Sequence, residues 1–213
     1  MTIEELCNIP LLMDIDTTVL EKCLTENQLF LRHYAKGATV HHQHDNCTSL
    51  DVVLSGNLVA YALSENGSAV TMFEFQKGSN IGANLLFGDH HTYPLNIYSV
   101  TASELLHITQ KAVMAFLYNY SFVLQYVKSL SYNSQGMNRK FTMLTQKTLR
   151  ENTLDYLKHQ SIIQDSAKII LPVSKKELAD YMGVQRPSLF RELKILKDEG
   201  LIEIDNRSIT VLF

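Results

Sequence analysis

Two groups of side chains in this sequence have the types and spacing to do chemistry. Between residues 185 and 194, two arginines, a serine and a lysine follow one another closely. An arginine can donate two hydrogen bonds to one guanine, and serine or lysine side chains can hold phosphate oxygens. Far upstream, His41, His42 and His44 offer imidazole nitrogens, which are common ligands of metal ions. The first group indicates nucleic-acid binding, and the second indicates metal binding.

The segment 171–196 has the signals of two short helices that would position the arginines. Ser174, with Glu177 three residues later, is a capping box, which begins a helix. Gly183 supplies the left-handed backbone that ends a helix, and Pro187 suits the first turn of the next one. Leucines at helical spacing would bury one side of the second helix: Leu189, Leu193 and Leu196. The pattern predicts a helix-turn-helix.

Two segments rich in β-branched residues, 201–204 and 209–212, follow and predict a β-hairpin. The whole unit is therefore predicted to be a winged helix-turn-helix, whose second helix enters the major groove of double-stranded DNA. The predicted DNA-binding residues are Lys175, Gln185, Arg186, Ser188, Arg191 and Lys194. The alternative interpretation is an ordinary helical hairpin with solvated charges.

A long helix is predicted from about residue 111 to residue 147. Its apolar residues alternate in steps of four and three from Phe116 to Leu144, which is the seam of a coiled coil, and Asn119 or Ser121 could cap its main segment. The predicted dimer-interface residues are Val123, Val127, Leu130, Ser134, Met137 and Phe141. A two-fold homodimer would match the paired half-sites that helix-turn-helix proteins bind. The alternative is a helix that packs on its own β domain.

Residues from about 30 to 108 form short apolar runs separated by turn signals. The predicted strands are residues 50–54, 58–63, 69–75, 95–100 and 104–108. Asn66-Gly67, between two of them, is a strong signal for a two-residue hairpin turn. Many short strands with regular turns indicate an all-β sandwich, roll or barrel.

Composition limits the class of protein. The chain has 213 residues with 46% hydrophobic content, enough for one large or two small domains. The net charge of −3 is unusual for a DNA-binding protein, but the part from Lys147 onward is slightly basic. DNA affinity must therefore come from a local cluster of cations and depend strongly on salt. We expect no membrane span, no signal peptide and, with three scattered cysteines, a reduced cytoplasmic protein.

In the order of these elements, the chain resembles the CRP/FNR family of bacterial transcription regulators. The most specific motifs are Ser55-Gly56, Ile81-Gly82 with Leu86-Phe87 downstream, and VSKKELADYMGVQRPSLFREL. The resemblance implies an α+β fold: a cyclic-nucleotide-binding-like β-roll (a cupin-like double-stranded β-helix) at 1–110, a dimerisation helix at 111–147, and a winged helix-turn-helix at 148–213. It also implies that Arg186, Ser188 and Arg191 bind a palindromic operator, and that RNA polymerase is a partner if the protein activates transcription. Pro187 replaces the glutamate of many members, so the operator sequence need not match theirs.

The resemblance places an effector pocket in the roll, but the residues that bind cyclic AMP are absent. Ala83 follows Gly82 where such members have a glutamate, and Tyr93-Pro94 replaces their arginine-serine pair. Nothing obvious remains to neutralise a buried phosphate. The predicted pocket residues are Gly82, Ala83, Asn84, His91 and Tyr93, and the effector is an unidentified small molecule. Iron–sulfur sensing needs four cysteines, and this chain has three.

The histidine motif leaves a second hypothesis open. His42 and His44 would share one face of a strand and could bind metal, so the roll could be a metal or haem sensor or a cupin-like metal enzyme. The glutamate that usually completes a cupin site is missing, since the next one is Glu65. We therefore expect no catalytic residues, no bound metal, no cofactor and no enzymatic activity.

Overall fold

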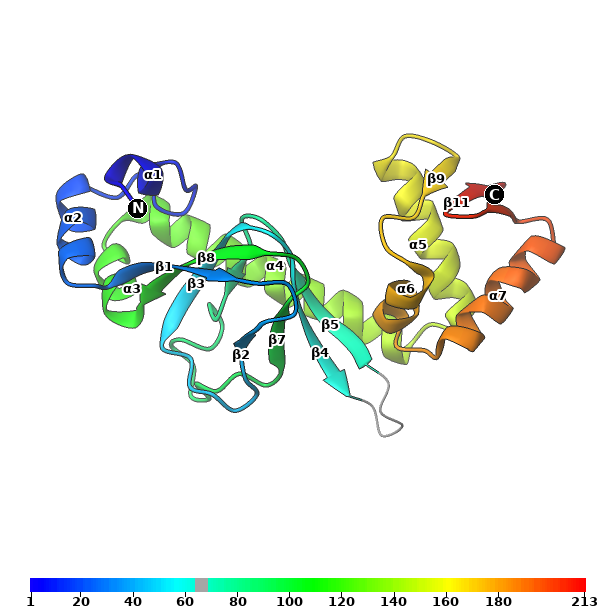
Figure 1. Ribbon diagram of the computed structural model, residues 1–213, viewed down its shortest axis with the longest axis horizontal. Helices are drawn as coiled ribbons and strands as arrows, with labels where there is room; N and C mark the ends of the chain where they lie inside the picture. Colours follow the sequence, from blue (N-terminus) through cyan, green and yellow to red (C-terminus); the bar gives the residue numbers. More distant parts are fainter. Residues whose placement is uncertain (64–68) are drawn as a thin grey trace. The chain divides into compact units, whose positions relative to one another are not determined.

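The computed structural model describes residues 1–63 and 69–213 (Figure 1). The chain divides into two compact units, of which the first comprises residues 1–61 and 73–137 and the second residues 62–72 and 138–213. The predicted turn at Asn66-Gly67 lies outside the described residues.

The first unit is built on strands that form two four-stranded sheets of a roll. One sheet has the order β1-β8-β3-β6 and the other β2-β7-β4-β5. The strands are β1 (Leu29–Tyr34), β2 (Thr39–His41), β3 (Ser49–Ser55), β4 (Leu58–Leu63), β5 (Ala69–Phe75), β6 (Asn80–Ile81), β7 (Asn96–Ser99) and β8 (Ser103–Thr109). The five predicted strands are confirmed as β3, β4, β5, β7 and β8. The sequence analysis missed β1, β2 and β6, which are short or lack a regular alternation of buried and exposed residues.

Helices close one end of this roll and run along it (Figure 1). They are α1 (Ile3–Cys7), α2 (Thr17–Thr25), α3 (Gln110–Phe116) and α4 (Tyr120–Thr145). Their apolar sides belong to the same core as the strands: Leu6, Leu20, Val113, Phe116 and Phe122 are buried together with Leu50 and Leu106. No helix in the described part of the chain is long and apolar enough to cross a membrane.

The predicted long helix is divided in two, which corrects the sequence-based expectation. α3 ends at Phe116, and Asn119 begins α4 by accepting a hydrogen bond from the Phe122 N–H at 3.0 Å. Phe116 is fully buried in the roll, so the exposed seam cannot begin there. The heptad spacing alone runs through the break, but the predicted cap at Asn119 is confirmed and marks where the main segment begins.

The second unit is a small α+β structure with its own core. It contains α5 (Leu149–Ile163), β9 (Lys168–Ile170), α6 (Lys175–Met182), α7 (Arg186–Asp198), β10 (Ile202–Asp205) and β11 (Ser208–Val211). The predicted hairpin is confirmed as β10 and β11, and β9 joins it in the order β10-β11-β9. Leu157, Leu178, Leu189, Leu193 and Ile209 form the buried centre of the unit. The fold is therefore a β-roll, a long helix and a winged helix-turn-helix, as predicted.

Candidate nucleic-acid interface and effector cavity

Local backbone signals hold α6 and α7 in the predicted arrangement. The Ser174 N–H donates to a Glu177 carboxylate oxygen at 2.7 Å, and the Glu177 N–H donates to Ser174 Oγ at 3.2 Å. Gly183 ends α6 with a φ of +69°, and a Cβ there would lie 2.9 Å from Leu144 Cδ2. Pro187 lies in the first turn of α7, where it removes no helical hydrogen bond. The capping box, the turn glycine and the proline are confirmed.

The predicted DNA-binding residues lie along α7 and its N-cap, from Gln185 to Lys194, except Lys175, which begins α6. Gln185, Arg186, Arg191 and Lys194 are exposed, whereas Lys175 and Ser188 are half-buried. Within the described residues, none of the four cations in this set takes part in an ion pair. By contrast, Arg150 on α5 pairs with Glu199 and lies 3.6 Å from Glu192. The cations at α7 are therefore free to meet an anionic partner.

Phe190 is a surface residue that the sequence analysis missed. It lies one turn after Arg186, and the Arg186 guanidinium carbon is 4.9 Å from the centre of its ring. The Lys175 ammonium lies 5.6 Å from the same ring. Contacts of this kind hold a cation by electrostatic attraction to the aromatic face. The four-residue spacing from Arg186 was the signal that could have revealed Phe190.

The start of α7 and the turn between β10 and β11 offer further groups that can bind an anion. Gln185 occupies the N-cap position without a side-chain hydrogen bond, so no side chain of the helix itself covers this positive end. In the β10–β11 turn, Asn206 has a φ of +52° and Arg207 is exposed. Arg207 is a second residue that the sequence analysis did not single out.

In the first unit, a cavity of about 250 Å³ lies between strands of the roll and α4. Its walls are mainly apolar and include Phe73, Phe75, Leu85, Leu95 and Leu130. Of the predicted pocket residues, Gly82, Asn84 and Tyr93 line this cavity. Ala83 and His91 do not: the Ala83 carbonyl accepts from the Tyr126 hydroxyl at 2.7 Å, and His91 Nδ1 lies 3.1 Å from the Leu85 carbonyl.

Tyr93 takes the place that the resemblance assigns to an arginine. It is 2% exposed, and its ring stacks on His41 with centroids 4.1 Å apart. Burial raises the pKa of Tyr93 strongly, and the nearby carboxylate of Asp51 adds to this effect. A negative charge at this position is therefore unfavourable. Its neighbour Pro94 also lines the cavity and has no hydrogen-bond donor to offer.

Beside the cavity, a buried carboxylate lies between two histidines. Asp51 is fully buried, and its two oxygens lie 2.5 Å from His41 Nε2 and 2.7 Å from His107 Nδ1. Ser49 Oγ also donates to the carboxylate at 2.6 Å, and the Tyr34 hydroxyl lies 3.0 Å from His107 Nε2. Burial alone would raise the pKa of Asp51, but the hydrogen bonds from the two histidines outweigh it and lower the pKa.

This cluster corrects the expected histidine site. β2 ends at His41, so His42 and His44 lie in the following loop and do not share a strand face. Among the described residues, the one set of donors close enough to hold a metal ion is His41, Asp51 and His107. The sequence analysis missed Asp51 and His107 because strand pairing between β3 and β8 joins them from 56 positions apart.

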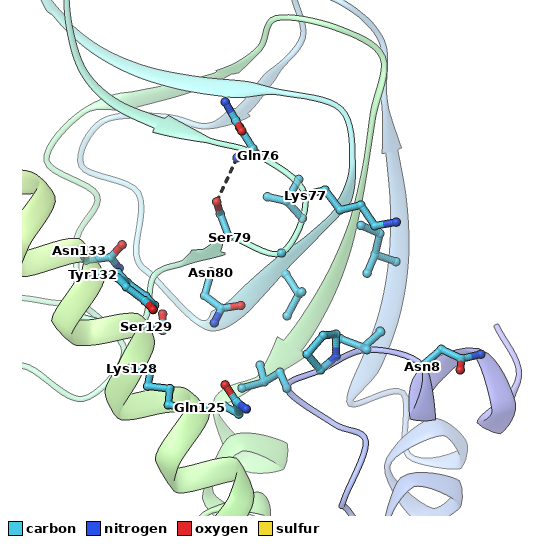
Figure 2. Close-up of a pocket in the computed structure, with 17 residues that line it drawn as sticks. Asn8, Gln76, Lys77, Ser79, Asn80, Gln125, Lys128, Ser129, Tyr132 and Asn133 are labelled. Carbon is cyan, nitrogen blue, oxygen red and sulfur yellow. Dashed lines mark hydrogen bonds between the residues drawn. The ribbon is translucent and has the colours of Figure 1, made fainter. Parts of the chain in front are cut away.

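A larger groove of about 710 Å³ lies on another side of the roll (Figure 2). α4 contributes Gln125, Lys128 and Tyr132, and the turn before β6 lies opposite them (Figure 2). Lys77, in that turn, points away from α4, and Gln76 donates its N–H to Ser79 Oγ at 3.0 Å (Figure 2). Unlike the smaller cavity, this groove has two cations, Lys77 and Lys128, among its described lining residues.

The outer side of α4 carries apolar side chains that nothing covers within the described chain. Val127 is 50% exposed and Met137 is 49% exposed, and Tyr120, Leu124 and Ser134 are exposed along the same helix. Phe141, in the second unit, is exposed as well. Of the predicted interface residues, Val123 and Leu130 are half-buried, and Leu130 packs on the core of the roll.

The fold and these sites define a class: a sensor roll joined by a long helix to a winged DNA-binding unit. Comparison with known proteins agrees with this class. Residues 31–120 match the model of the cyclic nucleotide-binding domain, and residues 150–212 match the Crp-like helix-turn-helix domain. The chain belongs to the CRP/FNR family of transcription regulators. Members of this family bind DNA and are not enzymes.

Curated relatives and solved structures are distant but cover almost the whole chain. The chain is 22% identical over 205 residues to the cAMP-activated global transcriptional regulator CRP of Salmonella typhimurium, covering 91% of this chain and 98% of that protein. The c-di-GMP responsive global regulator CLP of Xanthomonas campestris superposes with a TM-score of 0.70 at 21% identity, covering 92% of this chain and 99% of that one. A CRP/FNR regulator of Thermus thermophilus gives 0.65 at 19% identity, covering 86% and 94%. At this identity, the structures support the fold alone.

Proposed function

We propose that this protein is a homodimeric, sequence-specific transcription regulator whose roll responds to a small effector other than cyclic AMP. The observation that carries the proposal is the group of cations on α6 and α7, led by Arg186 and Arg191, which form no ion pair within the described residues. A helix of this kind places its N-terminal side chains against base edges in the major groove. Arg191 is assigned a bidentate base contact, and Lys175 and Lys194 are assigned contacts to phosphate.

The exposed side of α4 supports the dimer. Val127 and Met137 leave about half of their surface in water, and large apolar side chains in a row on a helix are typical of an interface. A second copy of this chain is the simplest partner for a seam of heptad spacing. A two-fold dimer would present two recognition helices to a palindromic operator in the bacterial cytoplasm, and RNA polymerase would be a further partner at an activated promoter.

Two features of the roll argue against cyclic AMP as the effector. No lysine or arginine is among the described residues that line the 250 Å³ cavity. The buried hydroxyl of Tyr93 occupies the place where a guanidinium would be needed. A phosphate moved from water into such a place would lose its hydration without gaining a counter-ion.

Selection of random-sequence duplex DNA by the purified full-length protein tests the regulator function. We expect enrichment of a two-fold-symmetric site, with binding that weakens steeply as salt increases. A matched pair of variants assigns the contact: Arg191→Ala should lose affinity for the site, and Lys158→Ala, which removes an exposed cation from α5, should not. If no sequence is enriched with or without cell extract as a source of effector, the proposal is wrong.

A metal-sensing roll is the second candidate function, and His41, Asp51 and His107 are the observation that favours it. These groups already satisfy one another by hydrogen bonds, so the cluster is complete without an ion. Elemental analysis of protein purified without an affinity tag separates the two cases. A metal present at one per chain would support the sensor, and substoichiometric metal would dismiss it.

A further inference from the structure

The chemistry of the 250 Å³ cavity defines the kind of molecule that it can hold. An apolar cavity of about 150 Å³ lined by Leu, Ile and Phe is large enough for benzene. The cavity of this roll is larger, and Phe73, Phe75, Leu95 and Ile97 provide similar walls. Its size therefore suits a bicyclic molecule or a short branched one.

Polar groups at the cavity are neutral. The polar side chains on its walls include three amides and a hydroxyl, those of Asn80, Asn84, Asn133 and Ser134. No lysine or arginine is among the described lining residues. Amides and hydroxyls orient a neutral ligand by hydrogen bonds, whereas an anion would need a positive partner.

Two buried oxygen atoms of residues that line the cavity have no hydrogen-bond partner within the described chain. Within the described chain, three buried side-chain oxygens lack a hydrogen-bond partner, and Asn80 Oδ1 and the Tyr93 hydroxyl are two of them. The Cys47 thiol lies beside the Tyr93 hydroxyl, but a thiol is a weak hydrogen-bonding group. Buried polar groups are rarely left without partners. The Asn80 amide lies at the border of the two spaces, because it lines both this cavity and the larger groove.

From these three observations we infer that the roll binds a neutral, mainly apolar small molecule that carries a hydroxyl or N–H group. The apolar part fills the space between Phe73, Phe75 and Leu95, and the donor meets the amide oxygen of Asn80. This inference rests on the proposed function, since it names the effector class of the regulator. Anionic molecules, including nucleotides, are excluded from the cavity.

Calorimetric titration of the full-length protein with three probes tests the ligand class. The probes are 1-naphthol, 1-naphthyl phosphate and cyclic AMP, of which the first two share one ring system and differ in charge. We expect 1-naphthol to bind at least tenfold more tightly than either of the others. Equal or tighter binding of 1-naphthyl phosphate or cyclic AMP would overturn the inference, as would the absence of 1-naphthol binding at millimolar concentration.

Variants then locate the site. Asn80→Leu should weaken 1-naphthol about fivefold to tenfold, because it removes the acceptor. Gln125→Leu removes an amide that lines only the larger groove and should leave 1-naphthol binding unchanged. Loss in the Gln125 variant with no loss in the Asn80 variant would contradict the assignment. Thermal unfolding of both variants establishes that they fold.

The DNA selection is independent of these titrations, so the two failures can be told apart. An enriched palindromic site without 1-naphthol binding would leave the regulator function standing and dismiss the ligand class. Binding of 1-naphthol without any enriched site would support the cavity chemistry and dismiss the regulator.

Discussion

The start of α7 and the interior of the roll use charge in opposite ways. At α7, Arg186 and Arg191 are exposed and unpaired within the described residues. In the roll, the carboxylate of Asp51 is fully buried and held by two histidines, and the neighbouring cavity has no cation among its described lining residues. An exposed, unpaired charge costs little stability and can bind a charged partner. A buried charge must instead be stabilised by hydrogen bonds or opposite charges inside the fold. Loss of charge should therefore cost affinity at α7 and stability in the roll.

Asp51→Ala should have the largest effect on stability. It removes the carboxylate that contacts both His41 and His107, and each lost hydrogen bond to a charged group costs about 1.5–3 kcal/mol. We expect the thermal transition of the roll to fall by many degrees, measured by calorimetry on the full-length protein.

A matched control separates burial from charge. Glu104 lies 3.6 Å from His33, and these side chains are 32% and 74% exposed. Glu104→Ala should change the free energy of unfolding by less than about 1 kcal/mol, because exposed pairs contribute little. If the two variants were equally destabilised, the contrast between buried and exposed charge would fail.

Arg191→Ala should have the largest effect on DNA binding. Loss of a bidentate base contact costs about 1–3 kcal/mol, roughly a fivefold to 150-fold decrease in affinity for the selected site. Its unfolding temperature should remain within experimental error, since the side chain is exposed. Fluorescence anisotropy with the selected duplex measures the first quantity and calorimetry the second. An Arg191 variant that binds DNA with normal affinity but unfolds at a lower temperature would contradict the assignment of this charge to DNA binding.

A fall in pH should lower the free energy of unfolding of the roll, because Asp51 then binds a proton. The pKa of Asp51 is lower in the folded chain than its ordinary value of 3.8, so the folded roll binds fewer protons than the unfolded chain. The stabilisation is therefore fully present above that value and is lost as the pH falls through the lower, folded pKa. Urea unfolding followed from about pH 5 to about pH 3 measures this slope. Asp51→Asn should flatten the slope, and a variant with an unchanged slope would exclude Asp51 as its cause.

Phe190→Ala should have the smallest effect. The ring is partly exposed and holds Arg186 and Lys175 by contacts worth about 0.5–1 kcal/mol at a surface. We expect a loss of DNA affinity of about twofold to fivefold with unchanged sequence preference. Phe190→Leu keeps bulk but loses the aromatic face, and it should behave like the alanine variant. Full affinity in the leucine variant would assign the effect to packing.

The helix-turn-helix could be predicted from the sequence because its signals are local. Ser174 and Glu177 are three positions apart, Gly183 sets its own backbone angle, and each acts within one turn of chain. The spacing of apolar residues likewise predicted five strands of the roll. At α4 the heptad spacing continued through the break and predicted one helix, whereas the local signal of the Asn119 cap marked where the main segment begins.

The interior of the roll could not be predicted in this way. Asp51 meets His107 because β3 and β8 pair in one particular register. Asn80 and Tyr93 come to line one cavity only after several strands and α4 have assembled. Pairs of this kind leave no periodic trace in a single sequence, so the histidine motif directed attention to His42 and His44 instead.

α4 contributes to two surfaces at once. Leu130, Ser134 and Met137 line the cavity, and Val127 and Met137 expose apolar surface on the same helix. If a second chain covers that surface, filling the cavity and pairing the chains become linked equilibria, and each must change the other by the same factor. The half-saturating dose of effector would then depend on how dilute the protein is. A titration repeated across a dilution series would report that linkage directly, without any DNA present.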